Sequence, residues 1–75
     1  MTYDEARREV EQGVIGGEYT RTQARRLRAA IRMLERYHIG IPVWHQLVDA
    51  TRGADWTERV LGLRRVAEPL RVVRF

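Results

Sequence analysis

Cysteine, serine, asparagine and lysine are all missing from this chain of 75 residues. The lack of cysteine excludes a disulfide framework and a thiolate metal site, and with serine missing too, the two commonest side-chain nucleophiles are gone. No run of about 18 apolar residues is present, and the opening MTYDEARREVEQ has no apolar stretch typical of a signal peptide. We therefore expect a non-enzymatic, cytoplasmic protein that holds no cofactor or metal and does not enter a membrane.

Because lysine is missing, all 14 basic residues are arginine. Charge is uneven along the chain: residues 1–19 carry a net −3, residues 20–38 a net +5 and residues 39–75 a net +2. An acidic head next to a basic segment can fold back on it or can present two surfaces of opposite sign. GC-rich coding bias explains the same composition, so the arginines have both a functional and a compositional interpretation.

Capping signatures and helix breakers predict four helices. Thr2 with Glu5, and Thr20 with Gln23, have the spacing of a capping box. Asp55 followed by Glu58 marks a further start. The predicted helices cover about residues 3–12, 20–38, 42–52 and 55–68.

The same breakers set the expected boundaries. Gly13 should end the first helix, and GVIGG at residues 13–17 should form a turn whose two apolar residues, Val14 and Ile15, tuck inward. Gly40 suits the left-handed position after the second helix, and Pro42 suits the first position of the third. Pro69 closes the fourth helix.

Apolar spacing assigns an inner face to each predicted helix. These inner positions are Tyr3, Ala6 and Val10; Leu27, Ala30, Ile31, Leu34 and Tyr37; Val43, Leu47 and Val48, with Trp44 beside them; and Trp56, Val60, Leu63 and Ala67. The fold class is therefore all-α, a small bundle of three to four short helices forming one domain over residues 1–75. Residues 69–75 are expected as a tail, a short strand or a segment that pairs with another chain, and a homodimer would form through the fourth helix or this tail.

The segment TRTQARRLRAAIRMLERYH at residues 20–38 carries six arginines. At about 100° per residue, five of them fall within an arc of about 80°, opposite the apolar face. We call these five residues the arginine row: Arg21, Arg25, Arg28, Arg32 and Arg36. Four like-charge neighbours three or four residues apart cost an isolated helix about 1–2 kcal/mol in total, so a negatively charged partner would compensate.

Several partners fit such a row. Arginine pairs bidentately with phosphate, and five along roughly 20 Å can follow a nucleic-acid backbone. Only Gln23 lies where a base-edge reader is expected, and no arginine–aromatic alternation indicates base stacking. The alternatives are a solvated face partly paired with Glu5, Glu9 and Glu11, an acidic protein surface, or a helix lying on a membrane surface.

Other candidate groups have ordinary structural explanations. His45 and Asp49 are one helical turn apart, with His38 nearby in the chain, but the pair is more typical of a helix edge than of a metal site. The glycines of residues 13–17 lack the lysine and spacing of a phosphate loop. Trp44 and Trp56 lie on apolar faces; in so small a domain either can also anchor a protein partner.

The order of a GVI turn, Tyr19, a long basic helix containing Ile31, and Gly-Ile-Pro at residues 40–42 resembles the CbpM family of chaperone modulators, which are MerR-like helical modules. The resemblance covers roughly residues 5–50. It implies a cytoplasmic protein that binds the J-domain of a DnaJ-like cochaperone or, through wider MerR kinship, one derived from DNA binding. The printed sequence has no segment comparable to the first helix of the MerR helix-turn-helix, so we do not expect sequence-specific DNA reading of the MerR kind.

J-domains generally present a basic helix, which the arginine row would repel. An acidic contact surface is therefore expected if the resemblance holds. The candidate residues for partner binding are Asp4, Glu5, Glu9, Glu11, Trp44 and Trp56. Our first hypothesis is a regulatory binder of a protein partner, and the alternative is nucleic-acid binding through the arginine row.

Overall fold

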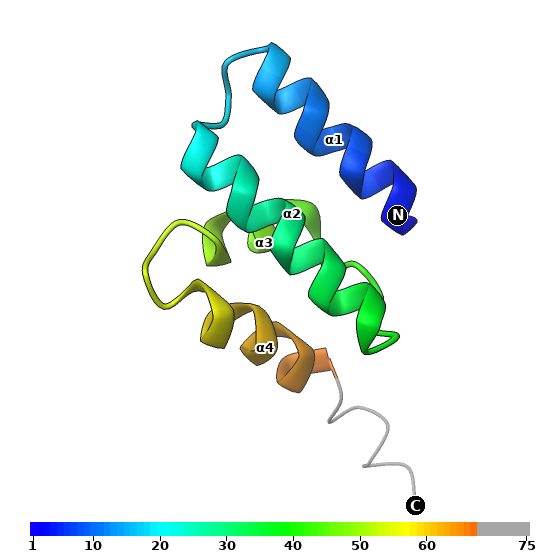
Figure 1. Cartoon of the computed structure of the whole chain (residues 1–75). Coiled ribbons are helices and arrows are strands. Elements are labelled where there is room, and N and C mark those ends of the chain that lie inside the picture. Colours follow the sequence, from blue (N-terminus) through cyan, green and yellow to red (C-terminus); the bar gives the residue numbers. More distant parts are fainter. Residues whose placement is uncertain (68–75) are drawn as a thin grey trace, which may run out of the picture.

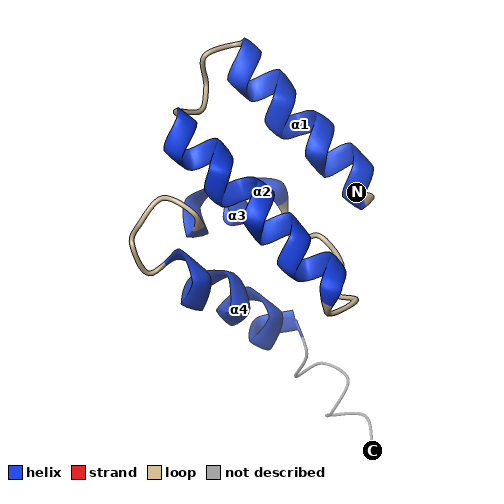
Figure 2. Ribbon diagram, viewed as in Figure 1, coloured by secondary structure: helices blue, strands red, loops and turns tan. Residues whose placement is uncertain are grey.

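The structure is a computed structural model that describes the backbone of residues 1–67 and the side chains of residues 1–63. Its helices are α1 (Tyr3–Ile15), α2 (Arg21–Arg36), α3 (Trp44–Ala50) and α4 (Trp56–Ala67). Within residues 1–67 every element is a helix, a turn or a loop (Figure 2), which confirms the all-α prediction. The predicted tail at residues 69–75 lies outside the described residues.

α2 lies at the centre of the molecule (Figure 1). α1 runs antiparallel along one side of it, α4 lies on the other side, and α3 passes behind. The buried core joins all four helices, with Leu27, Ile31 and Leu34 of α2 meeting Val10 of α1 and Val60 of α4. The remaining buried apolar residues are Ala6, Ala24, Ala30, Leu47, Val48 and Ala50. The predicted inner faces are confirmed at all of these core positions except Ala24 and Ala50, which were not predicted, and the side chain of the predicted Ala67 lies outside the described residues.

α1 is longer than predicted. Thr2 caps it through the expected capping box, but the helix continues through Gly13 to Ile15 and ends at Gly16. Gly13 is buried against the ring of Tyr19, and the chain reverses only at Gly17, which has φ +76°. The prediction that Val14 and Ile15 tuck inward is wrong: they remain helical and point outward, with Ile15 77% exposed.

α2 begins at the predicted cap, where the Thr20 hydroxyl accepts a hydrogen bond from the Gln23 backbone N–H at 3.1 Å. It ends at Arg36, and the residue in the left-handed conformation is His38, with φ 57°, rather than Gly40. The backbone N–H groups of His38 and Ile39 donate to the carbonyls of Glu35 and Leu34, which together form a Schellman motif. Tyr37 follows the last helical turn and is exposed, so its predicted place on the inner face is wrong.

Replacing His38 with glycine should stabilise the fold. An L-residue in the left-handed region costs about 1–2 kcal/mol, and part of that gain is lost because glycine is freer in the unfolded chain. We expect His38→Gly to raise the free energy of unfolding by about 0.5–1 kcal/mol, measured by urea denaturation. At the exposed neighbour Gly40, whose φ is not positive, Gly40→Ala should also raise the free energy of unfolding, by about 0.4–1 kcal/mol, because alanine restricts the unfolded chain. A loss of stability in His38→Gly would contradict the expected relief of the left-handed conformation.

α3 starts two residues later than predicted. Val43 occupies the N-cap position without any side-chain cap, and Pro42 precedes it instead of occupying the first helical position. Val43 is 57% exposed, so its predicted inward orientation is wrong, whereas Leu47 and Val48 are buried as expected. The proline fixes the loop before the helix, and the helical turn begins at Trp44.

The segment between α3 and α4 is held by an arginine outside the row. Nη1 of Arg26 donates hydrogen bonds to the carbonyls of Thr51, Arg52 and Gly53 at 3.3, 3.0 and 3.2 Å. These carbonyls follow the end of α3, where backbone acceptors lack helical partners. Arg26 therefore ties α2 to the turn that places α4.

Candidate arginine-rich interface

The arginine row lies on the solvent side of α2, as predicted. All five of its members are exposed, while the opposite side of the helix supplies the core. At about 1.5 Å per residue the row extends about 22 Å from Arg21 to Arg36. Within the described residues, Arg28 is the one member with an ion pair, so most of the row is unneutralised there.

Two ion pairs connect α1 with α2 on this side of the molecule. Nη2 of Arg28 donates to Oε1 of Glu11 at 2.7 Å. Arg7 reaches from α1 to the carboxylate of Glu35 and also pairs with Asp4 at 2.8 Å. The groups in both cross-helix pairs are close to half exposed, so each contributes at most about 1 kcal/mol to stability.

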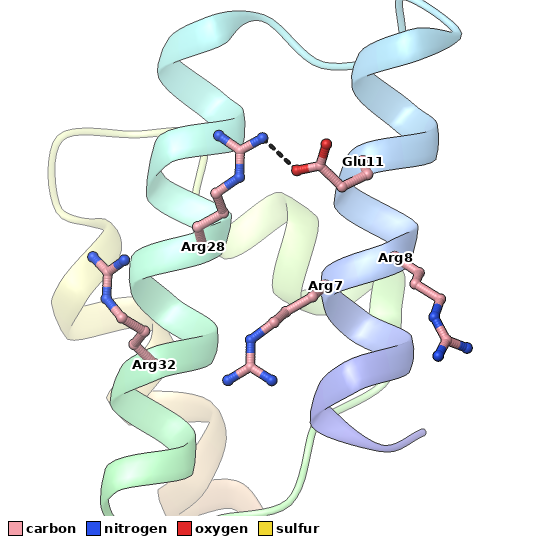
Figure 3. Close-up of a pocket in the computed structure, with 5 residues that line it drawn as sticks. All are labelled: Arg7, Arg8, Glu11, Arg28 and Arg32. Carbon is pink, nitrogen blue, oxygen red and sulfur yellow. Dashed lines mark hydrogen bonds and ion pairs between the residues drawn. The ribbon is translucent and has the colours of Figure 1, made fainter.

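A shallow groove of about 410 Å³ lies along the line where the two helices meet. Its lining residues are Arg7, Arg8, Glu11, Arg28 and Arg32. In the close-up, Arg7 and Arg28 reach into the space between the helices, whereas Arg8 and Arg32 extend away from it on either flank (Figure 3). Arg7 is paired with Glu35 and Asp4, and Arg28 with Glu11, so the positive charge of the groove that has no ion-pair partner among the described residues is that of Arg8 and Arg32 on its flanks.

The acidic head is largely engaged in interactions within the chain. Glu5 completes the α1 capping box: it accepts a hydrogen bond from the Thr2 backbone N–H at 2.7 Å. Hydrogen bonds from the Thr2 backbone and hydroxyl lower the pKa of the Glu5 carboxyl below its usual value. Asp4 pairs with Arg7 and Glu11 with Arg28. Glu9 is exposed and makes no ion pair within the described residues.

Both tryptophans pack against the core while remaining partly exposed. The indole Nε1 of Trp44 donates to the hydroxyl of Tyr19 at 3.1 Å, which links α3 to the loop before α2. Trp56 begins α4 and packs on the same cluster. Each tryptophan therefore contributes to the packing of the fold.

The histidines do not form a metal cluster. His38 and His45 are both exposed, and residues 1–67 hold no group of three His, Cys, Asp or Glu side chains arranged around a common point. Among the same residues, no helix has the length and apolar character needed to cross a bilayer.

Sequence reasoning located the row but missed the residues that complete its surroundings. In the sequence, Arg7 and Arg8 belong to a segment of negative net charge, and Arg26 is the one arginine of residues 20–38 outside the row. The helical wheel of α2 does set Arg26 well away from the row, at the edge of the apolar face. That position was the available signal for its structural role, whereas the pairing of Arg7 with Glu35 depends on how α1 packs.

We compared the chain with protein-family models, curated proteins and solved structures, and found no match in any of the three. The geometry and the charge of the candidate interface are therefore the basis for inferring its function.

Proposed function

We propose that this protein is a non-enzymatic nucleic-acid-binding module that contacts the phosphate backbone through the arginine row. The observation that carries the proposal is the exposure of all five guanidinium-bearing residues on one side of α2, with a single ion pair among them in the described part of the chain. Arginine forms bidentate, charge-assisted hydrogen bonds with phosphate oxygens. A row of five at intervals of three or four residues, about one helical turn, suits a polyanion with regularly repeated charges.

The proposed binding follows the backbone rather than reading bases. α1 flanks α2 on one side and α3 and α4 pack on its inner side, so only the solvent-facing arc of α2 is available to a ligand. Gln23, the residue suited to base-edge contacts, instead donates a long hydrogen bond of 3.4 Å to the Val48 carbonyl. Contacts to phosphate alone give affinity without sequence preference.

The salt dependence of binding tests the proposal. For a labelled DNA duplex of 20 base pairs, we expect the logarithm of the association constant to fall with the logarithm of salt concentration with a slope of about −4, since four to five phosphate contacts contribute about 0.9 each. Fluorescence anisotropy with two unrelated sequences should give equal affinities. Poly-glutamate is the control polyanion. Binding that is insensitive to salt, or poly-glutamate binding as tight as that of DNA, would contradict the proposal.

A regulatory protein that binds a partner such as a J-domain cochaperone, the first hypothesis from the sequence, is the second candidate. One observation favours it: Ile15 and Val14 are exposed at the end of α1, one helical turn after Glu11. An exposed apolar and acidic surface suits a basic amphipathic helix. Titration of the labelled protein with an isolated J-domain distinguishes the two, because changes in amide chemical shift at Ile15 without changes along α2 would favour this candidate.

A further inference from the structure

One side chain that lines the groove between α1 and α2 is itself negatively charged, the carboxylate of Glu11. The carboxylate of Glu11 lies 2.7 Å from Nη2 of Arg28, at a distance typical of a charge-assisted hydrogen bond. It is the only carboxylate among the five residues that line the groove, and the other four are arginines. Glu11 therefore occupies a position where a phosphate oxygen would meet the same donor.

We propose that the α1–α2 groove is a phosphodiester-binding subsite and that Glu11 competes with the phosphate for Arg28. This inference rests on the proposed function, since the phosphate is that of the nucleic acid bound along α2. Arg28 lies in the middle of the row, with two of the other four arginines on each side of it in sequence. A backbone that follows the row must therefore pass the groove, and the Glu11 side chain must leave Arg28 for the phosphate to bind there.

The exposure of the pair makes this exchange feasible. The Arg28 and Glu11 side chains are 44% and 60% exposed, so a ligand can reach the guanidinium and the released carboxylate returns to water. Arg7 keeps its own partners, Glu35 and Asp4, and continues to hold α1 against α2. The subsite can therefore open without separation of the helices, and α1 becomes part of the interface.

Removing the competing charge should strengthen binding. In the wild type, binding must break the Arg28–Glu11 pair and leave a carboxylate beside the phosphate. We expect Glu11→Gln to raise the affinity for the 20-base-pair duplex about threefold to fivefold at 0.1 M salt, measured by fluorescence anisotropy. Circular dichroism of the variant checks that the helices are intact.

The matched control is Glu9→Gln, which makes the same change in net charge on the same helix. Glu9 lies two residues from Glu11, on the other side of α1, and does not line the groove. Its replacement should change the affinity by less than about twofold, as expected for an exposed charge that is screened over distance. In an Arg28→Gln background, Glu11→Gln should lose its advantage over Glu9→Gln.

The outcomes separate this inference from the proposed function. If the wild type binds the duplex but Glu11→Gln gains no more than Glu9→Gln, or loses affinity, the subsite is wrong and binding along α2 stands. A gain in Glu11→Gln that persists without Arg28 also overturns it, because Arg28 would not be the contested group. If neither the wild type nor any variant binds nucleic acid, both proposals fail together.

Discussion

Replacing Arg25 and Arg32 with glutamine should weaken DNA binding about 60-fold at 0.1 M salt and stabilise the fold at the same time. Each phosphate contact contributes about eightfold through counterion release at this salt concentration, so two contacts multiply to about 60-fold. The two arginines also take part in all four like-charge neighbour pairs of the row. Removing those pairs should raise the free energy of unfolding by about 1 kcal/mol at low ionic strength.

If the arginine row binds DNA, the double variant should lose affinity while it gains stability. If the row only reflects coding bias, the variant should gain stability without losing affinity. Anisotropy titration measures the first effect and urea denaturation measures the second. The matched control is the pair Arg52→Gln and Arg59→Gln, which removes the same charge from residues that pair with Asp49 and Asp55. The control should bind DNA within a few-fold of the wild type. Equal losses in both double variants would mean that net charge, and not the row, governs binding.

Replacing Gly13 with alanine should destabilise the protein by about 1–3 kcal/mol, although alanine is the better helix former. A methyl group at Gly13 would overlap the ring of Tyr19, which packs directly over this position. The ring cannot move away without disturbing the Trp44 indole, which donates to the Tyr19 hydroxyl. Urea denaturation followed by tryptophan fluorescence measures the loss.

Gly62 in α4 provides the contrasting substitution. No described atom lies within 4 Å of the position that a methyl group would take there. Gly62→Ala should therefore gain about 1 kcal/mol from helix propensity alone. If both alanine variants were stabilised, the close packing of Tyr19 on α1 would be refuted, whereas opposite signs support it.

Short-range signals predicted most of the helices. Thr2 and Thr20 cap α1 and α2 where their sequence context indicated, because capping depends on residues only three positions apart. The apolar spacing of α2 also identified Leu27, Ile31 and Leu34 as core and the arginine row as exposed. Such periodic patterns are local properties of a helix, so they can be recognised in a sequence before the fold is known.

The incorrect predictions concern positions whose conformation depends on residues that are distant in the sequence or on where a helix ends. Gly13 looked like a helix end, but the space it leaves is filled by Tyr19, six residues further along and on the far side of a turn. His38 took the left-handed position that Gly40 was expected to fill, since the helix had already ended at Arg36. The groove could not be predicted from the sequence either, because the approach of Arg28 to Glu11 depends on the packing of α1 on α2.

The central position of α2 has a consequence for local unfolding. α2 contacts both α1 and α4, and it supplies Ala24, Leu27, Ala30, Ile31 and Leu34 to the buried core, so its opening requires the core to be lost. Amide protons within Leu27–Leu34 should therefore exchange with solvent at the slowest, global rate. The whole arginine row lies on α2, and Arg28 and Arg32 fall within Leu27–Leu34, so the spacing of the charges should be kept during fluctuations that open other parts of the molecule.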